Sequence, residues 1–543
     1  MVYRLVFVVL AALILTPAFS QTFTSSNLPI VKINTNGQTI IDDPKIEAEM
    51  AIVDNGPGMI NNVNDAPNSY NGKIGIEIRG SSSQMFPKKQ YGVELWDDAG
   101  EGIDASILGM PEEEDWVLFA PYNDKSLIRD ALAYKLGRDM GQYASRQRFC
   151  EVVLNDEYMG LFVFFEKIKR DGERVDIAKL DPDEVSGDDL TGGYIVKIDK
   201  STGSGGDGWV SSRKPFNSKE GQEIFFQYEV PSAEDIVEEQ KQYIQDFMKD
   251  FEDALAGNDF KDPELGYAKY IDVESFVDYY LINELTKNVD AYRLSTFLHK
   301  QRDSDGGKLR MGPIWDFNLG FGNVDYCIMG NPEGFVTSFN SICPDDFWQI
   351  PFWWAKFFQD PAFVEKVNTR WQELRAGPFG TNEILEYVDS LVIVLDDAQE
   401  RNFVRWPVLG EYVWPNFYVG NTYEQEVTWL KNWITQRLDW LDNYLPSVVT
   451  AVDEENTVAA NTSVYPNPFQ ESLILNYTLT RSGSVSFELT DPVGRSIAVY
   501  NQGNLLPGNY NLALDTSDLP RGMYVYRFRI GQGAGQTGKL FKP

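Results

Sequence analysis

The sequence predicts an α+β protein that ends in a small all-β sandwich, on three observations. Short apolar runs separated by turn residues fill residues 28–120, which predicts a β-rich N-terminal part. Residues 345–445 are rich in Trp and Phe and repeat apolar side chains at helical spacing. Residues 464–543 return to short alternating strands, as a β-sandwich does.

The elements between these parts follow from local patterns. Apolar residues at helical spacing predict helices over residues 125–141, 233–257 and 272–286. The segment 155–160 joins two apolar runs, as the turn of a tight hairpin does. Residues 451–463 are acidic and polar, which is typical of a linker between residues 21–450 and the C-terminal sandwich.

The net charge of the chain limits the kinds of partner that it can bind. The 543 residues carry a net charge of −33. Such a surface repels nucleic acid and anionic membrane, so we expect no nucleic-acid partner. The length allows two to four domains and a sizeable core.

The chain has one histidine, His299. Zinc sites built from several histidines are therefore excluded. His299 alternates with Leu298 on a predicted strand, which predicts an exposed histidine rather than the base of a Ser-His-Asp hydrolase. Chemistry must then rest on carboxylates, lysine, arginine and hydroxyls.

The first 20 residues resemble a secretory signal. Arg4 precedes an apolar run from Leu5 to Leu15, and small residues follow up to Ser20. No other segment offers about 18 uninterrupted apolar residues, so we expect an exported mature chain without a transmembrane segment. In that compartment Cys327 and Cys343 could form a disulfide, whereas Cys150 lies in an apolar strand and is expected to stay a buried thiol.

The most informative segment runs from residue 287 to residue 323. Alternating apolar residues from Tyr292 to Leu298 predict a strand, and a second strand, Leu309–Ile314, follows a polar turn. Their pairing would bring Asp290 and Asp316 to the same end of a hairpin. Two converging carboxylates suit a divalent cation and a phosphorylated substrate.

Several sequence words in this order resemble the CotH kinase family. They are RGSSSQMFPKKQYGVEL (79–95), DWVLFAPYNDKSLIRDALAYKLGRDMG (115–141), LNDEYMGLFVFFEKIK (154–169), TGGYIVKID (191–199), and the pair NVDAYR and GPIWDFN. The resemblance covers residues from about 29 to 445 and implies an atypical, bilobal protein-kinase-like fold. It also implies transfer of the γ-phosphoryl group of ATP, with Mg²⁺ or Mn²⁺, to Ser or Thr of an unknown protein acceptor.

Residues 464–543 resemble the C-terminal sorting domain of type IX secretion cargo. The matching words are YPNPF (465–469), DPVGR (491–495), LPRGMYVYR (519–527) and KLFK (539–542). This resemblance implies a Bacteroidetes-type source, recognition by the type IX secretion machinery, and a secreted or cell-surface location.

The kinase resemblance suggests roles around the two aspartates. Asp290 occupies the position of the catalytic-loop aspartate, and Asp316 in Trp-Asp-Phe-Asn resembles the metal ligand of Asp-Phe-Gly. Ser295 falls where kinases place a second metal ligand. The chain lacks His-Arg-Asp, and the roles of Asp124 and Arg129 stay open, although their helix could supply a partner for the phosphate-binding lysine.

The same resemblance suggests nucleotide ligands. Lys89 shares the inward face of a predicted strand, which favours it over the outward Lys88 as the phosphate lysine. Arg79 and Ser81 lie on a Gly-Ser turn that could cover phosphates. The alternatives are a lysine that only snorkels and a turn without a ligand.

Two further residues could hold the base. Glu166 ends an apolar strand near the expected hinge, where it could hold adenine or simply face solvent. Trp315 could stack on the base or pack in the core.

Two other functions stay open. An exported enzyme must find ATP outside the cytoplasm, which favours a surface adhesion protein on a kinase-like scaffold. The aromatic residues 347–354 would then form a ligand surface, although core packing is the favoured interpretation of them. A carbohydrate-active enzyme is a weaker alternative, because nothing fixes a catalytic pair.

Overall fold

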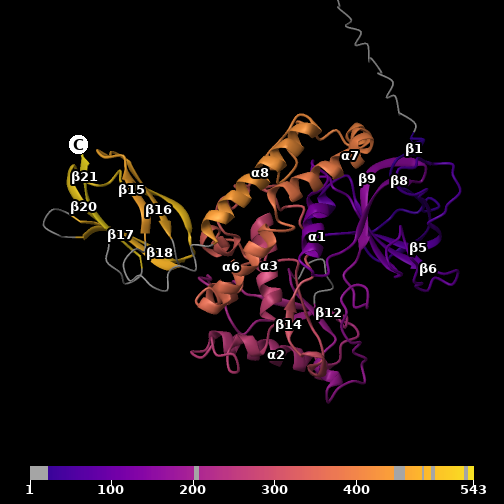
Figure 1. The fold of residues 1–543 in the computed structure, drawn as a ribbon, viewed down its shortest axis with the longest axis horizontal. Coiled ribbons are helices and arrows are strands. Elements are labelled where there is room, and N and C mark those ends of the chain that lie inside the picture. The colour runs from indigo at the N-terminus through magenta and orange to yellow at the C-terminus, as the bar shows by residue number, and fades with distance from the viewer. Residues whose placement is uncertain (1–22, 201–206, 446–458, 480–481, 491–495, 531–535) are drawn as a thin grey trace, which may run out of the picture.

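The computed structural model describes residues 23–200, 207–445, 459–479, 482–490, 496–530 and 536–543 (Figure 1). These residues form mixed helix and sheet, which confirms the predicted α+β class. The predicted signal peptide lies outside the described residues. No described helix is long and apolar enough to cross a membrane.

A closed β-barrel forms the N-terminal part. Its strands, in spatial order, are β2 (Ile30–Asn34), β3 (Ile46–Val53), β5 (Tyr70–Arg79), β6 (Gln90–Trp96), β7 (Asp115–Phe119), β9 (Glu157–Glu166) and β8 (Gln147–Leu154). The parallel pairing of β2 with β8 closes the barrel and so removes its free edges. Buried Val31, Ile74 and Val93 belong to its core. The short strands β1 (Ser25–Ser26) and β4 (Asn61–Asn62) pair with each other.

A second, five-stranded sheet and most of the helices make up the middle of the chain. The sheet has the order β11 (Gly208–Val210), β12 (Phe225–Val230), β10 (Tyr194–Ile198), β13 (Thr296–Lys300), β14 (Leu309–Met311). The helices are α1 (Arg129–Asp139), α2 (Glu238–Ala256), α3 (Val273–Thr286), α4 (Phe339–Ile342), α5 (Trp353–Phe357), α6 (Pro361–Arg375), α7 (Thr381–Arg405) and α8 (Tyr423–Tyr444). In Figure 1, α1 lies between the barrel and α3.

Helix α3 leads the chain to the predicted catalytic segment. All its residues except Glu274 are buried, so its position is fixed on nearly every side. Asp272 caps it by accepting a hydrogen bond from the Ser275 N–H at 2.9 Å.

The C-terminal domain is a two-sheet, all-β unit at the opposite end of the molecule from the barrel (Figure 1). One sheet has the order β15 (Ala459–Tyr465), β16 (Ser472–Leu479), β19 (Gly508–Asp515), and the other has the order β18 (Ser496–Leu505), β17 (Gly483–Thr490), β20 (Gly522–Ile530), β21 (Gln536–Lys542). Both sheets contribute to one apolar core that includes Leu475 and Phe528. The linker is predicted over residues 451–463. Its last residues, 459–463, belong to β15, and residues 446–458 lie outside the described part.

Some of the predictions about single residues are confirmed and others are wrong. The disulfide Cys327–Cys343 and the buried thiol Cys150 are confirmed. The prediction that His299 is exposed is wrong. Its side chain is half-buried, and its Nδ1 lies 3.0 Å from the Gly312 carbonyl oxygen. Within residues 347–354, Trp353 and Trp354 are buried in the core while Phe347 is exposed.

We expect the substitution Arg437→Met to lower the free energy of unfolding by about 3–5 kcal/mol. Arg437 on α8 lies 3.2 Å from Glu284 on α3, and neither side chain has exposed surface. Because Glu284 also accepts the Val336 and Thr337 N–H groups, it would stay buried without its arginine. Chemical denaturation measures the loss.

The control for this prediction is Lys431→Met on the same helix. Lys431 forms a partly exposed ion pair with Asp389, so its loss should cost less than about 1 kcal/mol. Equal effects of the two substitutions would contradict the predicted importance of the buried pair.

Candidate functional site

The two predicted aspartates lie at one end of a β-hairpin. Strands β13 and β14 pair antiparallel, with Leu298 opposite Met311, so the chain before β13 and the chain after β14 meet at the same end. Desolvation raises the pKa of Asp316, and the negative charge of Asp290 adds to the rise, as expected of two carboxylates at the same end of the hairpin. The predicted convergence is therefore observed.

The strand after Asp290 is shorter than predicted. It begins at Thr296 rather than at Tyr292. Tyr292 and Ser295 have φ of 70° and 47°, and extended backbone is impossible there. Asp290 instead starts a turn in which its carbonyl accepts the Leu294 N–H at 3.0 Å.

The backbone of Asp316 is held in the left-handed region, with φ of 66°. Its N–H donates to the Tyr134 hydroxyl at 3.2 Å, and its carbonyl accepts from Asn288 Nδ2 at 3.1 Å. The next N–H, that of Phe317, donates to the buried Asp130 at 2.7 Å. Strained backbone that the surroundings fix in this way is common at functional sites.

The carboxylate of Asp316 has no hydrogen-bond partner among the described residues, although its backbone has several. The Asp316 side chain is exposed, but the protein atoms around it displace part of the water that would hydrate its carboxylate. This loss of hydration, followed by the charge of Asp290, raises the pKa of Asp316 to about 6.

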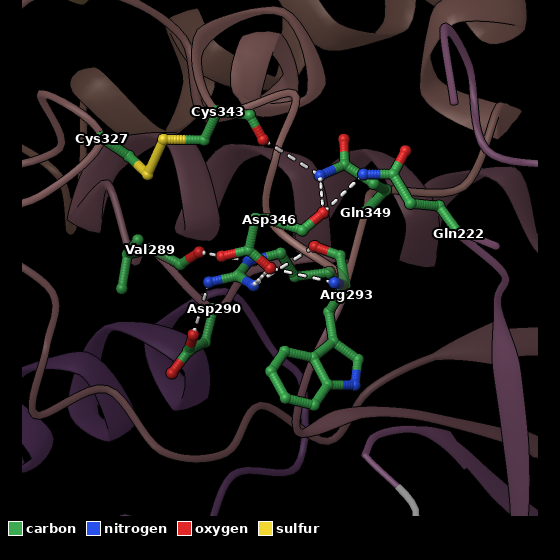
Figure 2. Close-up of a disulfide and its surroundings, with 9 residues drawn as sticks. Gln222, Val289, Asp290, Arg293, Cys327, Cys343, Asp346 and Gln349 are labelled. Atoms are coloured by element: carbon green, nitrogen blue, oxygen red, sulfur yellow. Dashed lines mark hydrogen bonds and ion pairs between the residues drawn. A yellow bond between two sulfur atoms is a disulfide. The ribbon is translucent and has the colours of Figure 1, made fainter. Parts of the chain in front are cut away.

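Arg293 fixes the carboxylate of Asp290. Its Nη2 lies 2.9 Å from Asp290 Oδ1, and its Nη1 lies 3.3 Å from Asp346 (Figure 2). Burial raises the pKa of Asp290, and the charge of Arg293 partly opposes this rise. The second oxygen of Asp290 has no hydrogen-bond partner among the described residues.

The disulfide anchors the loop that holds this arginine. Gln349 Nε2 donates to the Cys343 carbonyl at 3.1 Å and to the Asp346 carbonyl at 2.7 Å. Figure 2 shows Cys327–Cys343 beside this loop. The covalent link therefore supports the position of Asp346, and through it that of Arg293.

A third carboxylate joins the two predicted ones. Asp199 directly follows β10, whose last residue Ile198 lies opposite Thr296 of β13. Burial raises the pKa of Asp199, and the charge of Asp290 contributes to the rise. Asp199 ends the family word TGGYIVKID (191–199), which assigns it no role. Its position directly after a buried strand is the signal that could have identified it.

Arg79 and Trp315 lie together beside Asp316. The Arg79 guanidinium lies 5.5 Å from the centre of the Trp315 ring. Burial lowers the pKa of Arg79, and the negative charge of Asp316 partly opposes this. Trp315 is half-buried, and its ring centre lies 5.3 Å from that of Phe165 and 6.2 Å from that of Phe297. The tryptophan thus packs on the core while Arg79 covers it, and its stacking on a base stays a prediction.

The predicted outward direction of Lys88 is wrong. Both residues precede β6, so the strand alternation does not apply to them. Lys88 is buried and donates to the Leu161 carbonyl and to Asn402 on α7, at 2.5 and 2.8 Å. Lys89 is half-buried and donates to the Gln84 carbonyl at 2.5 Å, and its phosphate role stays a prediction.

Asp124 and Arg129, at the start of the helix that was expected to supply a partner for Lys89, interact with each other instead. Arg129 and Asp124 form a buried ion pair with each other at the start of α1. Asp124 also accepts the Ser126 and Arg129 N–H groups, at 3.0 and 2.9 Å. Their role in the structure is therefore to hold the beginning of α1.

Glu166 does not face solvent. It is buried, its Oε1 lies 2.8 Å from Arg146, and its Oε2 accepts the Arg146 N–H and the Tyr143 hydroxyl. Arg174 lies 3.9 Å away. An adenine ring would have to compete with these contacts, so the geometry favours a role in holding the chain after β9.

The two predicted serines are less informative. Ser81 is exposed and precedes a 3₁₀ turn, Ser82–Met85. Ser295 Oγ has no hydrogen-bond partner among the described residues. Neither observation tests the predicted ligand roles.

One compact acidic group lies elsewhere. Glu113, Glu114 and Asp115 bring carboxylate oxygens within 4.8 Å of one another, but Lys169 lies within 3.0 Å of all three. Lysine thus takes the place that a cation would have. Among the described residues, Asp199, Asp290 and Asp316 do not form so compact a group.

The comparisons with known proteins decide the family. Residues 76–441, more than half of the chain, match the model of the CotH kinase protein. The chain belongs to the CotH kinase family. Residues 463–542 match the secretion system C-terminal sorting domain, so both predicted resemblances are confirmed. No curated protein matches the chain significantly.

These matches support a coarse functional statement. The chain is a kinase-like CotH family protein, and its sorting domain indicates type IX export to the cell surface or beyond.

The raised pKa of Asp316 predicts how pH affects the stability of this CotH family protein. An unfolded aspartate loses its proton near pH 4, whereas the folded Asp316 keeps it to about pH 6. Between these values the folded state binds more protons, so its stability falls as pH rises. In Asp316→Asn this contribution is absent.

Thermal unfolding without metal, measured from pH 4 to pH 8, tests this expectation. The melting temperature of Asp316→Asn minus that of the wild type should grow from pH 4 to about pH 6 and then level off. A difference that is independent of pH would contradict the raised pKa.

Proposed function

We propose that this protein is an exported atypical protein kinase that transfers the γ-phosphoryl group of ATP to a Ser or Thr hydroxyl of a protein. The observation that carries the proposal is the convergence of Asp290 and Asp316 at one end of the β13–β14 hairpin, with two hydrogen bonds to the Asp316 backbone and a third from the N–H of Phe317. Such an arrangement suits phosphoryl transfer, which depends on positioning and charge.

In this proposal the fold is bilobal. The barrel would be the N-terminal lobe, and the second sheet with its helices would be the C-terminal lobe. Arg79, at the end of β5 in the barrel, covers Trp315, which follows β14 in the other part. ATP would bind where these two parts meet, with Arg79 near its phosphates and Lys89 and Ser81 as further predicted phosphate ligands.

The carboxylates fit a hard divalent cation such as Mg²⁺ or Mn²⁺. Asp316 would hold the ion, because its oxygens have no other partner among the described residues, and Asp199 would assist. The three carboxylates are not compact enough to enclose an ion, and Mg²⁺ usually keeps several waters and phosphate oxygens as ligands. When bound, the ion neutralises phosphate charge.

Asp290 would orient the acceptor hydroxyl. One of its oxygens is held by Arg293 at 2.9 Å, and the other can accept the hydroxyl proton. Burial raises its pKa, which makes the carboxylate a better base than an ordinary aspartate.

A phosphotransfer assay tests the proposal. The mature full chain would be incubated with γ-labelled ATP, Mg²⁺ or Mn²⁺, and a mixed protein acceptor, and phosphoserine and phosphothreonine would be located by mass spectrometry. We expect label on Ser or Thr with either metal and none with chelator. Hydrolysis of ATP without phosphorylated protein would contradict a protein kinase.

A surface binding protein is the second candidate. Ile328, Phe347 and Trp414 are exposed, and Tyr326 stacks on Trp414 with ring centres 6.3 Å apart. Exposed apolar side chains of this kind can bind a partner. This function would be favoured if the chain bound no ATP.

A further inference from the structure

A cavity of about 660 Å³ lies apart from the two aspartates, neither of which lines it. Its walls come from the end of α1, the first turns of α3, the β13–β14 hairpin and the loop 174–177. This volume lies within the range of small-molecule sites, about 300–1,000 Å³. The cavity is thus large enough for an organic ligand.

The interior of the cavity is mainly apolar. Met140, Ile177, Met311 and Ile314 line it and are buried. Tyr279 adds an aromatic ring, and its hydroxyl is already used on Thr296 at 3.2 Å. A ligand with a planar apolar body would pack against these side chains.

The charged side chains deeper in the walls, some buried and some partly exposed, are already paired. Arg310 lies 2.8 Å from Asp272, and Asp278 lies 2.8 Å from Arg370 outside the cavity. Arg174 lies 3.1 Å from Glu113. The remaining charged side chains, Asp176, Asp305 and Lys308, are exposed at the rim. The interior therefore favours an uncharged ligand, because a buried charge without a partner is costly.

His299 is one of the polar residues that line this cavity. Its Nδ1 lies 3.0 Å from the Gly312 carbonyl, which can only accept, so Nδ1 carries the proton. Nε2 is then an acceptor, and it has no hydrogen-bond partner among the described residues. Burial lowers the pKa of His299 to about 4, so the ring is neutral near pH 7.

We propose that this cavity binds an uncharged aromatic molecule whose hydroxyl or amino group donates a hydrogen bond to His299 Nε2. The proposal does not rest on the kinase function, because none of the residues assigned to phosphoryl transfer lines the cavity.

N-phenyl-1-naphthylamine is a suitable probe, since it is uncharged, aromatic and carries one N–H donor. Its fluorescence in titrations of the mature full chain should show one saturable site. His299→Leu should weaken binding about tenfold, the effect of losing one hydrogen bond. Met140→Trp should weaken binding by narrowing the cavity, whereas Phe347→Ser, on an exposed apolar side chain, should not change it.

The single histidine allows a second measurement without any substitution. In a chain labelled with ¹⁵N-histidine and purified without a histidine tag, His299 is the one imidazole observed. Saturating probe should shift the Nε2 resonance and leave Nδ1 protonated. This measurement decides the question if a variant fails to fold.

Three results would overturn the proposal. They are the absence of saturable binding, saturation without a change at Nε2, and binding that is unchanged in Met140→Trp but is lost in Phe347→Ser. The MgATP affinity of the same preparations is a separate readout, so failure of this site is distinguishable from failure of the kinase proposal.

Discussion

Asp316→Asn is expected to lower phosphoryl transfer about 10³-fold, because metal stabilisation of the transferred charge is worth several kcal/mol. Asparagine tolerates the left-handed backbone that Asp316 adopts, with φ of 66°. The substitution therefore removes the negative charge while the contacts of the backbone to Tyr134 and Asn288 remain. Initial rates of phosphate transfer at saturating Mg²⁺ measure the effect.

The matched control is Asp305→Asn. Asp305 is exposed at the tip of the same hairpin, in the turn Asp303–Asp305, and should leave the rate unchanged. If the two variants lost activity equally, Asp316 would not be a metal ligand.

Asp290→Asn is expected to lower transfer by roughly 10²–10⁴-fold while leaving MgATP affinity nearly unchanged. Its carboxylate is proposed to act on the acceptor hydroxyl, not on the nucleotide. This separates it from Asp316, whose loss should weaken both. Rates and calorimetric affinities of the two variants, measured side by side, test the assignment.

Asp345→Asn controls for the loss of a negative charge nearby, since Asp345 is exposed and pairs with Lys219. It should change neither quantity. A large loss of MgATP affinity in Asp290→Asn would place this aspartate on the metal instead.

Local patterns predicted the scaffold of the site well. The helices α1, α2 and α3 and the β13–β14 hairpin follow from periodicity and turn residues, and they suffice to bring Asp290 and Asp316 together. Where the pattern failed, backbone conformation was the reason. Positive φ at Tyr292 and Ser295 delays β13, although the alternation of apolar residues continues through them.

Contacts distant in the chain explain most of the remaining misses. Lys88 is buried because Asn402 and the Leu161 carbonyl satisfy its amine, and Asn402 is 314 positions away. Glu166 is enclosed by partners that are nearer in the chain: Arg146 precedes β8, which pairs with β9, and Arg174 follows β9. The pattern of β9 alone does not show that the chain on either side folds back onto Glu166.

The same limit applies to the acidic group. Asp199 joins Asp290 because β10 pairs with β13, and these strands are separated by about a hundred residues of other structure. The closing of the barrel by β2 and β8 is likewise a long-range pairing. Such pairings depend on the whole fold, and a single sequence does not specify them locally.

Calorimetric titration of the mature full chain with MgATP tests the central claim most directly. We predict saturable binding with a stoichiometry of about one, which disappears in Asp316→Asn and persists in Asp305→Asn. Failure of the wild-type chain to bind MgATP or MnATP at millimolar concentration would contradict a kinase site and favour a surface binding protein on this scaffold.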